Sequence, residues 1–230
     1  MNNRRNENEI AYQVNLPDFE SIDIRPLNLD EDLLTIHDWF NRDHAHFWGL
    51  VGKSVEKVRS IYQERLEEEG HEVFIGEYSS SQEPLFLLHL YEPKKDGLAE
   101  YYDAQDSDRG THQFLAPVAV KIPNFTQNIF AAICEFAFHY PEVQRIVAEP
   151  DIRNEKQFIA CKRAGYSLGS VIYLPNKTCQ LVFLTREQYS NVRRQPTRSK
   201  EKFLFRPVWV KFHVLIGKIR RRLIKLGFLK

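Results

Sequence analysis

Two residues whose side chains can carry protons stand at the ends of apolar segments. His112 follows the turn DRG at 108–110 and is the second residue of the predicted strand 111–120. Asp151 directly follows the predicted strand 143–150. Ligands in open α/β sheets collect at strand ends, so these two side chains could face one cleft if the strands are neighbours. An imidazole beside a carboxylate is the usual pair for deprotonating a nucleophile.

Each of these residues also has a plain structural interpretation. A histidine in a strand is more often a hydrogen-bonded core or surface residue than a catalytic base. The Glu-Pro-Asp segment at 149–151 could be a simple turn, since proline and aspartate favour turns. Asp151 could also cap a helix that begins near Asn154. The local pattern leaves these interpretations open.

The elements that must position these side chains follow from hydrophobic periodicity. Asp30 is predicted to cap the first helix, and Gly165 is predicted to end the last helix of the domain. The order β-α-α-β-β-β-α-β-α-β-β favours an α/β fold with a mixed sheet covered by helices. The predicted strands are 21–28, 71–78, 84–93, 111–120, 143–150, 167–175 and 178–185, the predicted helices are 30–41, 54–70, 125–140 and 153–166, and 93–110 is a predicted loop.

Length and charge divide the chain. Its 230 residues suffice for one large domain with an appendage. We predict an N-terminal arm at 1–20, one folded domain at 21–190 and a basic amphipathic tail at 191–230. Residues 186–230 contain 14 Lys and Arg and 2 Asp and Glu, a net charge of +12, whereas the remainder carries −11. An acidic body is therefore followed by a basic segment.

Cysteine usage and the N-terminal segment indicate the environment. Cys134, Cys161 and Cys179 are widely spaced and odd in number, so neither a disulfide framework nor a zinc site is expected. A reducing compartment fits this composition. The segment MNNRRNENEI lacks the apolar stretch of a signal peptide, and no apolar run is long enough to span a bilayer. We expect a cytoplasmic protein, at most peripheral at the inner membrane surface.

The element order resembles that of the GNAT superfamily of acyl-CoA-dependent N-acyltransferases, and four segments carry the resemblance. They are the helix and Phe-Trp motif IHDWFNRDHAHFWGLVGKS at 36–54, the strand entry AEYYDAQDSDRGTHQFLAP at 99–117, the strand-to-helix motif RIVAEPDIRNEKQFIACKRAGY at 145–166, and the terminal hairpin. Residues 20–190 resemble the siderophore-biosynthesis N-acyltransferases in particular, such as those of aerobactin and mycobactin assembly. The joint occurrence of these motifs is specific.

The resemblance implies a GNAT-like, mixed and mostly antiparallel central sheet flanked by helices. The basic C-terminal helical tail, predicted from its charge and apolar spacing, lies outside the segment that carries the resemblance. The resemblance also implies that His112 and Asp151 are catalytic. His112 would be the base, and Asp151 would orient the imidazole or hold the distal ammonium of the acceptor. The substrate pocket would be lined by His46, Phe47, Trp48, Tyr102 and Asp103.

Some of these pocket residues have a second interpretation. Phe47 and Trp48 could equally pack the first helix onto the sheet. Tyr102 could cover the sheet edge rather than line a cleft. The motif alone does not separate these roles.

The co-substrate implied by the resemblance is acetyl-CoA or another acyl-CoA, without a metal. The superfamily holds pyrophosphate with a loop Arg/Gln-x-x-Gly-x-Gly/Ala, because glycines let backbone N–H groups approach phosphate. The equivalent stretch here, VKIPNFTQNIF at 120–130, contains no glycine. Asn154, which could instead begin a helix with Arg153, lies where the superfamily contacts the pantetheine arm. The expected cofactor-binding residues are Lys121, Phe125, Thr126, Gln127, Asn128 and Asn154.

The sequence therefore predicts acyl transfer, with acetyl as the first choice, to an N-hydroxylated lysine or diamine in hydroxamate siderophore biosynthesis. A hydroxylamine nitrogen is strongly nucleophilic and largely unprotonated near neutral pH, so modest base assistance and accurate placement suffice. Two alternatives remain open. The first is an N-acetyltransferase of another amine, such as an aminoglycoside. The second is a non-catalytic GNAT-fold interaction module.

The basic tail adds a prediction about partners. An amphipathic helix with a cationic face can lie on an anionic membrane. It can equally dock on a protein, either the acidic body of this or a neighbouring chain or a siderophore synthetase. No nucleic-acid-reading motif accompanies the basic residues, so nucleic acid is not an expected partner.

Overall fold

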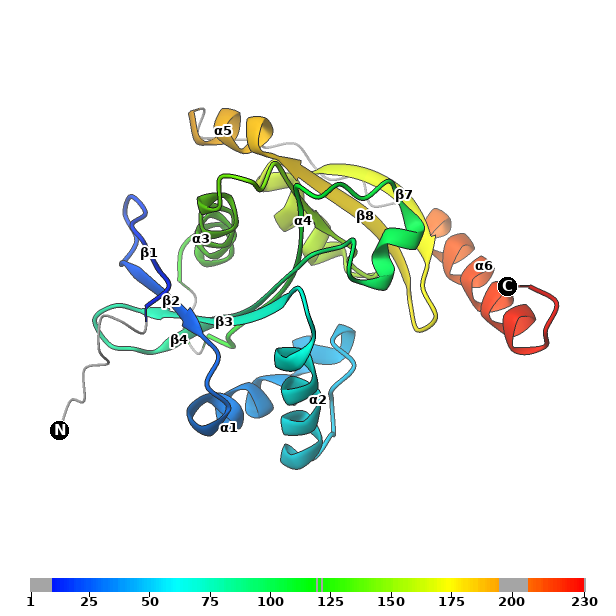
Figure 1. Cartoon of the computed structure of the whole chain (residues 1–230), viewed down its shortest axis with the longest axis horizontal. Helices are drawn as coiled ribbons and strands as arrows, with labels where there is room; N and C mark the ends of the chain where they lie inside the picture. The colour runs from blue at the N-terminus through cyan, green and yellow to red at the C-terminus, as the bar shows by residue number, and fades with distance from the viewer. Residues whose placement is uncertain (1–9, 119, 121, 195–206, 230) are drawn as a thin grey trace. The chain divides into compact units, whose positions relative to one another are not determined.

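The computed structural model describes residues 10–118, 120, 122–194 and 207–229. The chain forms two compact units, 1–144 and 145–230, which are described separately. Figure 1 labels the main helices and strands of both.

The first unit contains an antiparallel sheet whose strands follow chain order, β1-β2-β3-β4-β5. Short connections join β1 to β2 and β3 to β4, whereas residues 27–70, which contain two helices, separate β2 from β3, and residues 92–107 separate β4 from β5. One strand, β1, was not predicted, and it lies inside the predicted N-terminal arm. The strands are β1 (Tyr12–Val14), β2 (Ile22–Pro26), β3 (His71–Tyr78), β4 (Pro84–Tyr91) and β5 (Asp108–Leu115).

Helices cover both faces of this sheet. Successive strand residues point to opposite faces, so Val73 and Ile75 of β3 join the apolar core beneath α1 and α2, whereas Phe74 meets Phe136 of α3 at a ring-centroid distance of 4.8 Å. Figure 1 shows α1 and α2 on one side of these strands and α3 on the other. The helical segments are α1 (Leu29–Phe40), the 3₁₀ turn η2 (Asp43–Phe47), α2 (Val55–Glu67), the 3₁₀ turn η3 (Gly97–Tyr101) and α3 (Phe125–His139).

Asn28, not Asp30, caps α1. Asn28 has extended backbone angles, and its side chain accepts a hydrogen bond from the backbone N–H of Asp30. Asp30 is therefore in the first turn, where a carboxylate favours the helix dipole. Helix α2 is capped by Ser54, whose hydroxyl accepts from the backbone N–H of Lys57 at 3.3 Å. The predicted end at Gly165 is confirmed by its φ of +95°.

Strand β5 begins earlier and ends earlier than predicted. Its first residue is Asp108, whose buried carboxylate accepts from the Tyr102 hydroxyl at 2.9 Å and from the backbone N–H of Gln105 at 3.0 Å. These bonds fix the turn before the strand. The strand stops at Leu115, two residues before Pro117, which has no N–H to donate. His112 is therefore in the middle of β5 rather than at its entrance.

A buried ion cluster joins β2, α1 and β3. The guanidinium of Arg25 donates to both carboxylate oxygens of Asp32 at 2.8 Å and, through Nε, to Glu77 at 3.0 Å. All three side chains are at most 6% exposed. Burial raises the pKa of the Glu77 carboxyl, and the charge of Arg25 opposes that rise. The cluster thus ties the first helix to two strands through charges that depend on one another.

The second unit contains three antiparallel strands in the order β6-β8-β7. The predicted terminal hairpin is confirmed as β7 and β8. Helix α6 packs against that hairpin: the Tyr173 hydroxyl lies 2.8 Å from Nδ1 of His213. The elements are β6 (Arg145–Ala148), α4 (Glu155–Arg163), β7 (Ser167–Tyr173), β8 (Thr178–Thr185), α5 (Arg186–Arg194) and α6 (Pro207–Lys225).

Candidate functional site

His112 lies within a cluster of rings on the α1–α2 side of the first sheet. It is directly opposite His89 of β4 in the strand register. Its ring centroid lies 5.1 Å from Tyr91, 6.2 Å from His89 and 6.3 Å from Trp48. The imidazole is half-buried. His112 is therefore packed on several sides and still partly accessible.

The second histidine, His89, is a buried neutral group. Its ring is 7% exposed, lies 5.5 Å from the Tyr62 ring, and its Nε2 has no hydrogen-bond partner among the described residues. Burial lowers the pKa of His89 well below its ordinary value, and the charges of His112 and Arg65 lower it further. Protonation of His89 is therefore unfavourable in the folded chain.

We expect the pH dependence of stability to report on this buried imidazole. The unfolded chain binds a proton at His89 near pH 6.5, whereas the folded chain does not, so the free energy of unfolding falls as pH drops below about 6.5. The slope is about 1.4 kcal/mol per pH unit for one such group, down to the lowered pKa of the folded state. Urea denaturation at several pH values measures it. His89→Gln should flatten the slope of the free energy of unfolding against pH. The control is His139→Gln, which changes an exposed histidine and should keep the parental slope. Equal slopes for the two variants would contradict this prediction.

Gly110 creates the space that the cluster needs. It is the register partner of Tyr91, and a Cβ at this position would overlap the Tyr91 ring. Only glycine therefore lets that ring lie across the strand and reach His112.

Gly110→Ala is expected to displace Tyr91 and with it the packing around His112. We expect a stability loss of about 1–3 kcal/mol from overpacking, together with a fall in kcat/KM. Thermal unfolding and steady-state kinetics measure the two effects. Gly97→Ala is the matched control, because a Cβ at Gly97 meets no atom within 4 Å. Equal behaviour of the two variants would show that the ring position does not matter.

The three predicted pocket residues of the Phe-Trp motif differ in exposure and in their contacts. His46 is exposed, and its Nδ1 lies 3.1 Å from the backbone oxygen of Asp43. Trp48 contacts both the core and the His112 ring. It packs against the core, stacking on Phe40 at 6.0 Å and donating from Nε1 to the Tyr62 hydroxyl, and it also presents its ring to His112. Phe47 is half-buried and lies against His46 at a centroid distance of 3.9 Å.

The other predicted pocket residues, Tyr102 and Asp103, lie in the loop before β5. The Tyr102 hydroxyl is engaged by Asp108, so its described role is to shape the entry of the strand. Asp103 is exposed, and its backbone oxygen accepts from the side chain of Gln105. No described contact assigns either residue to a ligand.

Asp151 lies in the second unit and is almost completely buried. It forms an isolated bridge with Cys179 of β8. Its carboxylate accepts from the backbone N–H of Arg153 at 2.9 Å, from Nε at 2.8 Å and from Nη2 at 2.7 Å. Asp151 does not cap α4. The cap is Asn154, whose side chain accepts a hydrogen bond from the backbone N–H of Gln157. Asp151 and Arg153 therefore act as one ion pair.

Lys177 and Glu149 form a second ion pair near Asp151 and were missed by the sequence analysis. Lys177 Nζ donates to the backbone oxygen of Glu149 at 3.1 Å and to its carboxylate at 3.3 Å. Burial raises the pKa of the neighbouring Cys179 thiol to about 12. This thiol is protonated at neutral pH, so it is not an activated nucleophile.

The expected coenzyme-binding residues lie mostly in the first turn of α3. Phe125 is buried, Thr126 is exposed, and Gln127 and Asn128 are half-buried. Asn124 precedes the helix with φ +56°, and no side chain caps the helix start. Asparagine tolerates this left-handed conformation better than most residues, so it supplies the turn that glycine usually provides. Lys121 lies outside the described residues.

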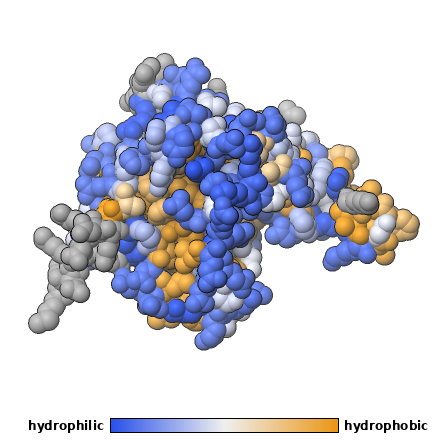
Figure 2. All heavy atoms as spheres, viewed as in Figure 1, coloured by the Kyte–Doolittle hydropathy of each residue, from blue (hydrophilic) through white to orange (hydrophobic). Residues whose placement is uncertain are grey.

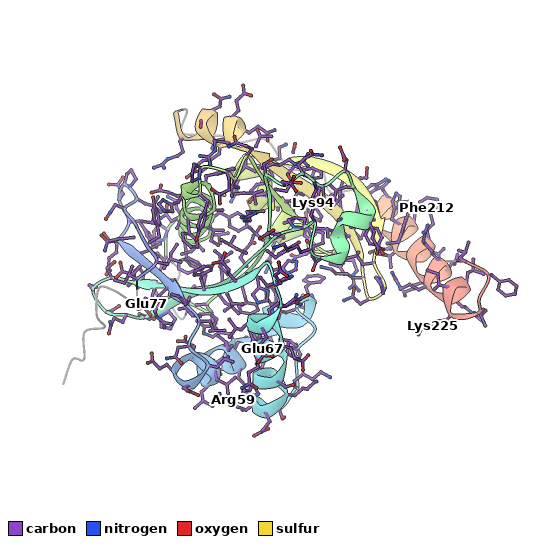
Figure 3. All side chains as sticks on the ribbon, in the orientation of Figure 1. Arg59, Glu67, Glu77, Lys94, Phe212 and Lys225 are labelled. Atoms are coloured by element: carbon purple, nitrogen blue, oxygen red, sulfur yellow. The ribbon has the colours of Figure 1, made fainter. Side chains whose placement is uncertain are left out.

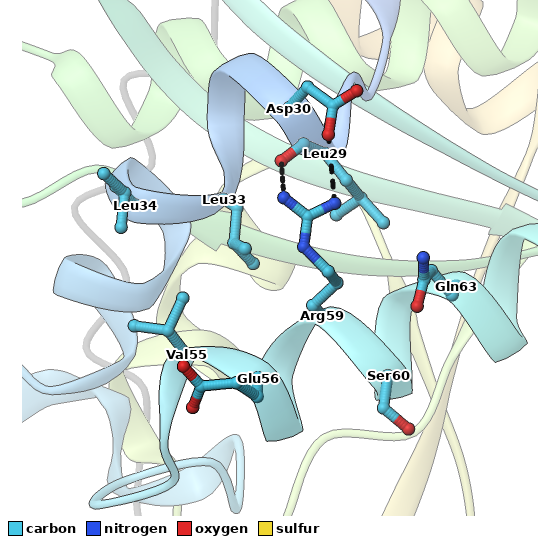
Figure 4. A pocket seen from close by; sticks show the side chains of 9 residues that line it. All are labelled: Leu29, Asp30, Leu33, Leu34, Val55, Glu56, Arg59, Ser60 and Gln63. Atoms are coloured by element: carbon cyan, nitrogen blue, oxygen red, sulfur yellow. Dashed lines mark hydrogen bonds and ion pairs between the residues drawn. The ribbon is translucent and has the colours of Figure 1, made fainter.

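Two further features were not predicted. Among the described residues, Glu68, His71 and Asp96 have potential ligand atoms within 4.8 Å of one another and could hold a metal ion. A pocket between α1 and α2 contains Arg59, which donates to Asp30 and to the backbone oxygen of Leu29 (Figure 4). No predicted site residue lines that pocket.

Comparison with known proteins places these features in a family. A family model described as an acetyltransferase (GNAT) domain matches residues 28–174. The chain is 28% identical over 170 residues to N-hydroxyputrescine acetyltransferase of Acinetobacter baumannii. The aligned segment is 72% of this chain and 78% of that protein. The chain is 27% identical over 162 residues to N(5)-hydroxyornithine:cis-anhydromevalonyl coenzyme A-N(5)-transacylase SIDF of Beauveria bassiana, which covers 69% of this chain but only 35% of that protein.

A solved structure shows the same fold. The aminoglycoside acetyltransferase AAC(6')-Ib in complex with coenzyme A superposes with a TM-score of 0.65 at 22% identity, over 75% of this chain and 99% of that one. The predicted GNAT fold of the domain is confirmed by these matches, whereas they do not test the basic tail. The predicted acetyl-CoA co-substrate is confirmed as that of GNAT acetyltransferases. The chain therefore belongs to the GNAT acetyltransferase family and is an acyl-CoA N-acyltransferase.

Proposed function

We propose that this protein transfers an acetyl group from acetyl-CoA to the hydroxylamine nitrogen of an N-hydroxylated lysine or diamine, as a step in hydroxamate siderophore biosynthesis. The observation that carries the proposal is the half-buried His112 beside Trp48, in the segment that resembles the siderophore branch. The names of the Acinetobacter and Beauveria relatives, both of which specify N-hydroxylated amines, support it.

His112 is proposed as the base. The acceptor nitrogen attacks the thioester carbon, a C–N bond forms, and the C–S bond breaks to release the thiolate of coenzyme A. The nitrogen loses one proton, which His112 accepts and which ultimately protonates the thiolate. Trp48 and Tyr91 hold the imidazole in place. Direct transfer is consistent with the protonated Cys179 thiol, which does not offer a covalent intermediate.

Asp151 is proposed to act through its pair with Arg153. Three N–H groups of Arg153 occupy three of the roughly four acceptor positions of the carboxylate. The remaining position suits the distal ammonium of a lysine or diamine. Asp151→Asn should then raise KM for the acceptor more than it lowers kcat.

Coenzyme A is proposed to bind at the start of α3. The helix N-terminus attracts phosphate, its first turn contains no acidic residue, and Asn124 provides the left-handed turn that precedes it. Thr126, Gln127 and Asn128 would contribute mainly through backbone N–H groups, with Asn154 contributing near the pantetheine arm.

Thiol release from acetyl-CoA tests the proposal. N-hydroxylysine, N-hydroxycadaverine and N-hydroxyputrescine should be turned over well, and lysine, cadaverine and putrescine are matched controls that lack only the hydroxyl. The hydroxamate product is detected as its coloured ferric complex. Higher kcat/KM for an aminoglycoside, the function suggested by the fold neighbour, would replace the proposed acceptor. Absence of both turnover and acetyl-CoA binding in calorimetry would favour the interaction module.

A further inference from the structure

The C-terminal segment carries most of the exposed large apolar side chains. Nine of the fifteen such residues in the described chain lie between 207 and 229, about a tenth of the sequence. Figure 2 shows apolar side chains concentrated on the surface of this segment. Scattered exposed apolar residues need no explanation, but a concentration of this kind marks an interaction surface. The nine residues are Val208, Trp209, Phe212, Leu215, Ile219, Ile224, Leu226, Phe228 and Leu229.

One face of α6 is already occupied by the second unit. Residues on this face recur three or four positions apart and contact the β7–β8 hairpin. Gly217 lies so close to Thr178 that a Cβ would overlap its hydroxyl, and Arg221 donates to the backbone oxygen of Leu174 at 3.3 Å. The contacting residues are Val210, His213, Gly217 and Arg221. This contact holds the helix along the hairpin and leaves its other sides exposed.

The exposed sides separate into an apolar strip and a basic strip. The apolar strip follows the spacing of one helix face through Val208, Phe212, Leu215 and Ile219, which are between 51% and 81% exposed. The basic strip borders it through Lys211, Lys218, Arg222 and Lys225, and Arg220 lies at the opposite border. Residues 207–229 contain six Lys and Arg and no Asp or Glu. Figure 3 labels Phe212 and Lys225 on this helix.

We propose that α6 and the residues that follow it bind an anionic lipid surface, with the helix lying in the plane of the interface. An apolar strip bordered by cations matches the two regions of such a surface, the acyl chains and the charged headgroups. The apolar side chains enter the acyl boundary, and the long Lys and Arg side chains extend to the lipid phosphates. None of the described helices has the length and apolarity to cross a bilayer, so the contact is peripheral.

A lipid surface fits these residues better than a protein partner. The core of a protein interface is depleted of charged residues, with lysine among those depleted. Here the border is purely cationic and runs along the apolar strip. The apolar residues also continue beyond the helix through Leu226, Phe228 and Leu229, which extends the strip without adding any opposite charge.

Sedimentation of the full-length protein with vesicles tests the proposal. Vesicles that contain phosphatidylglycerol should bind the protein, phosphatidylcholine vesicles should bind it much more weakly, and added salt should weaken the first interaction. The double variant Phe212→Ser, Ile219→Ser should weaken binding by about tenfold or more. Leu34→Ser, an equally exposed apolar site in the first unit, is the matched control and should bind like the parent.

Fluorescence of Trp209 locates the contact. This residue is 37% exposed, and its emission should shift to shorter wavelength and be quenched by brominated lipids. Trp209→Phe should remove that response without removing binding. Equal binding to neutral vesicles, no binding to any vesicle, or unchanged binding of the double variant would overturn the proposal. So would a parent that self-associates in ultracentrifugation and a double variant that does not, because the strip would then be a protein interface.

The outcome is separable from that of the proposed function. Acetyl transfer to soluble acceptors is measured without vesicles, and the double variant should retain it. Loss of vesicle binding with intact acetyl transfer concerns only α6, whereas loss of acetyl transfer with intact vesicle binding concerns only the catalytic proposal.

Discussion

His112→Gln is expected to lower kcat for acetyl transfer by roughly 100- to 10,000-fold, the usual contribution of a positioned general base. Glutamine retains hydrogen-bonding groups but cannot accept the proton from the attacking nitrogen. Because His112 is half-buried and its neighbours remain, thermal stability should change little. Thiol release at saturating acetyl-CoA gives kcat.

The matched control is His139→Gln, an exposed histidine near the end of α3 that contacts Tyr12. It should retain the parental kcat and pH profile. A His112→Gln variant within a few-fold of the parent at every pH would remove His112 from the catalytic role. A large loss of stability in that variant would instead identify a packing residue, as a histidine in a strand often is.

Arg25→Met is expected to cause the largest loss of stability. It leaves the Asp32 and Glu77 carboxylates buried without a counter-charge, and breaking a buried pair in this way typically costs about 3–5 kcal/mol. Arg42→Met is the control, because Arg42 and Asp38 form a pair in which both side chains are 54% exposed. Such an exposed pair contributes about 0–1 kcal/mol. Urea denaturation gives both values.

The effect of Arg25→Met should depend on pH with a definite sign. Burial already raises the pKa of Glu77, and removal of Arg25 raises it further. As the pH falls, Glu77 of the variant becomes protonated and the uncompensated charge disappears, so the loss should be smaller near pH 5 than near pH 8. Adding Asp32→Asn and Glu77→Gln to Arg25→Met should recover part of the stability. A loss independent of pH and unaffected by these changes would point to packing alone.

The sequence determined most of the elements and their order, although β1 and α5 were not predicted. Helical spacing and strand alternation depend on residues only two to four positions apart, so they are readable without a structure. The end at Gly165 and the terminal hairpin were both predicted on this basis. The errors were also local: Asn28 competes with Asp30 for the same helix start, and the buried Asp108 carboxylate moves the start of β5 forward.

The tertiary structure decided which groups surround each histidine and each charged residue discussed above. His89 faces His112 because of the β4–β5 register, and Trp48 reaches His112 from a 3₁₀ turn more than sixty residues earlier in the chain. Neither contact leaves a trace in local periodicity. Arg25 meets Glu77 for the same reason, across a separation of 52 residues.

Helix α6 likewise has some features that its sequence determined and others that only the tertiary structure decided. Its sequence predicted a basic amphipathic helix, since charge and apolarity are properties of the residues themselves. Which face is occupied depends on the β7–β8 hairpin, where the close approach of Gly217 to Thr178 fixes the contact. Types of side chain and their spacing are encoded locally, whereas burial, pKa and exposed surface arise only when distant segments pack together.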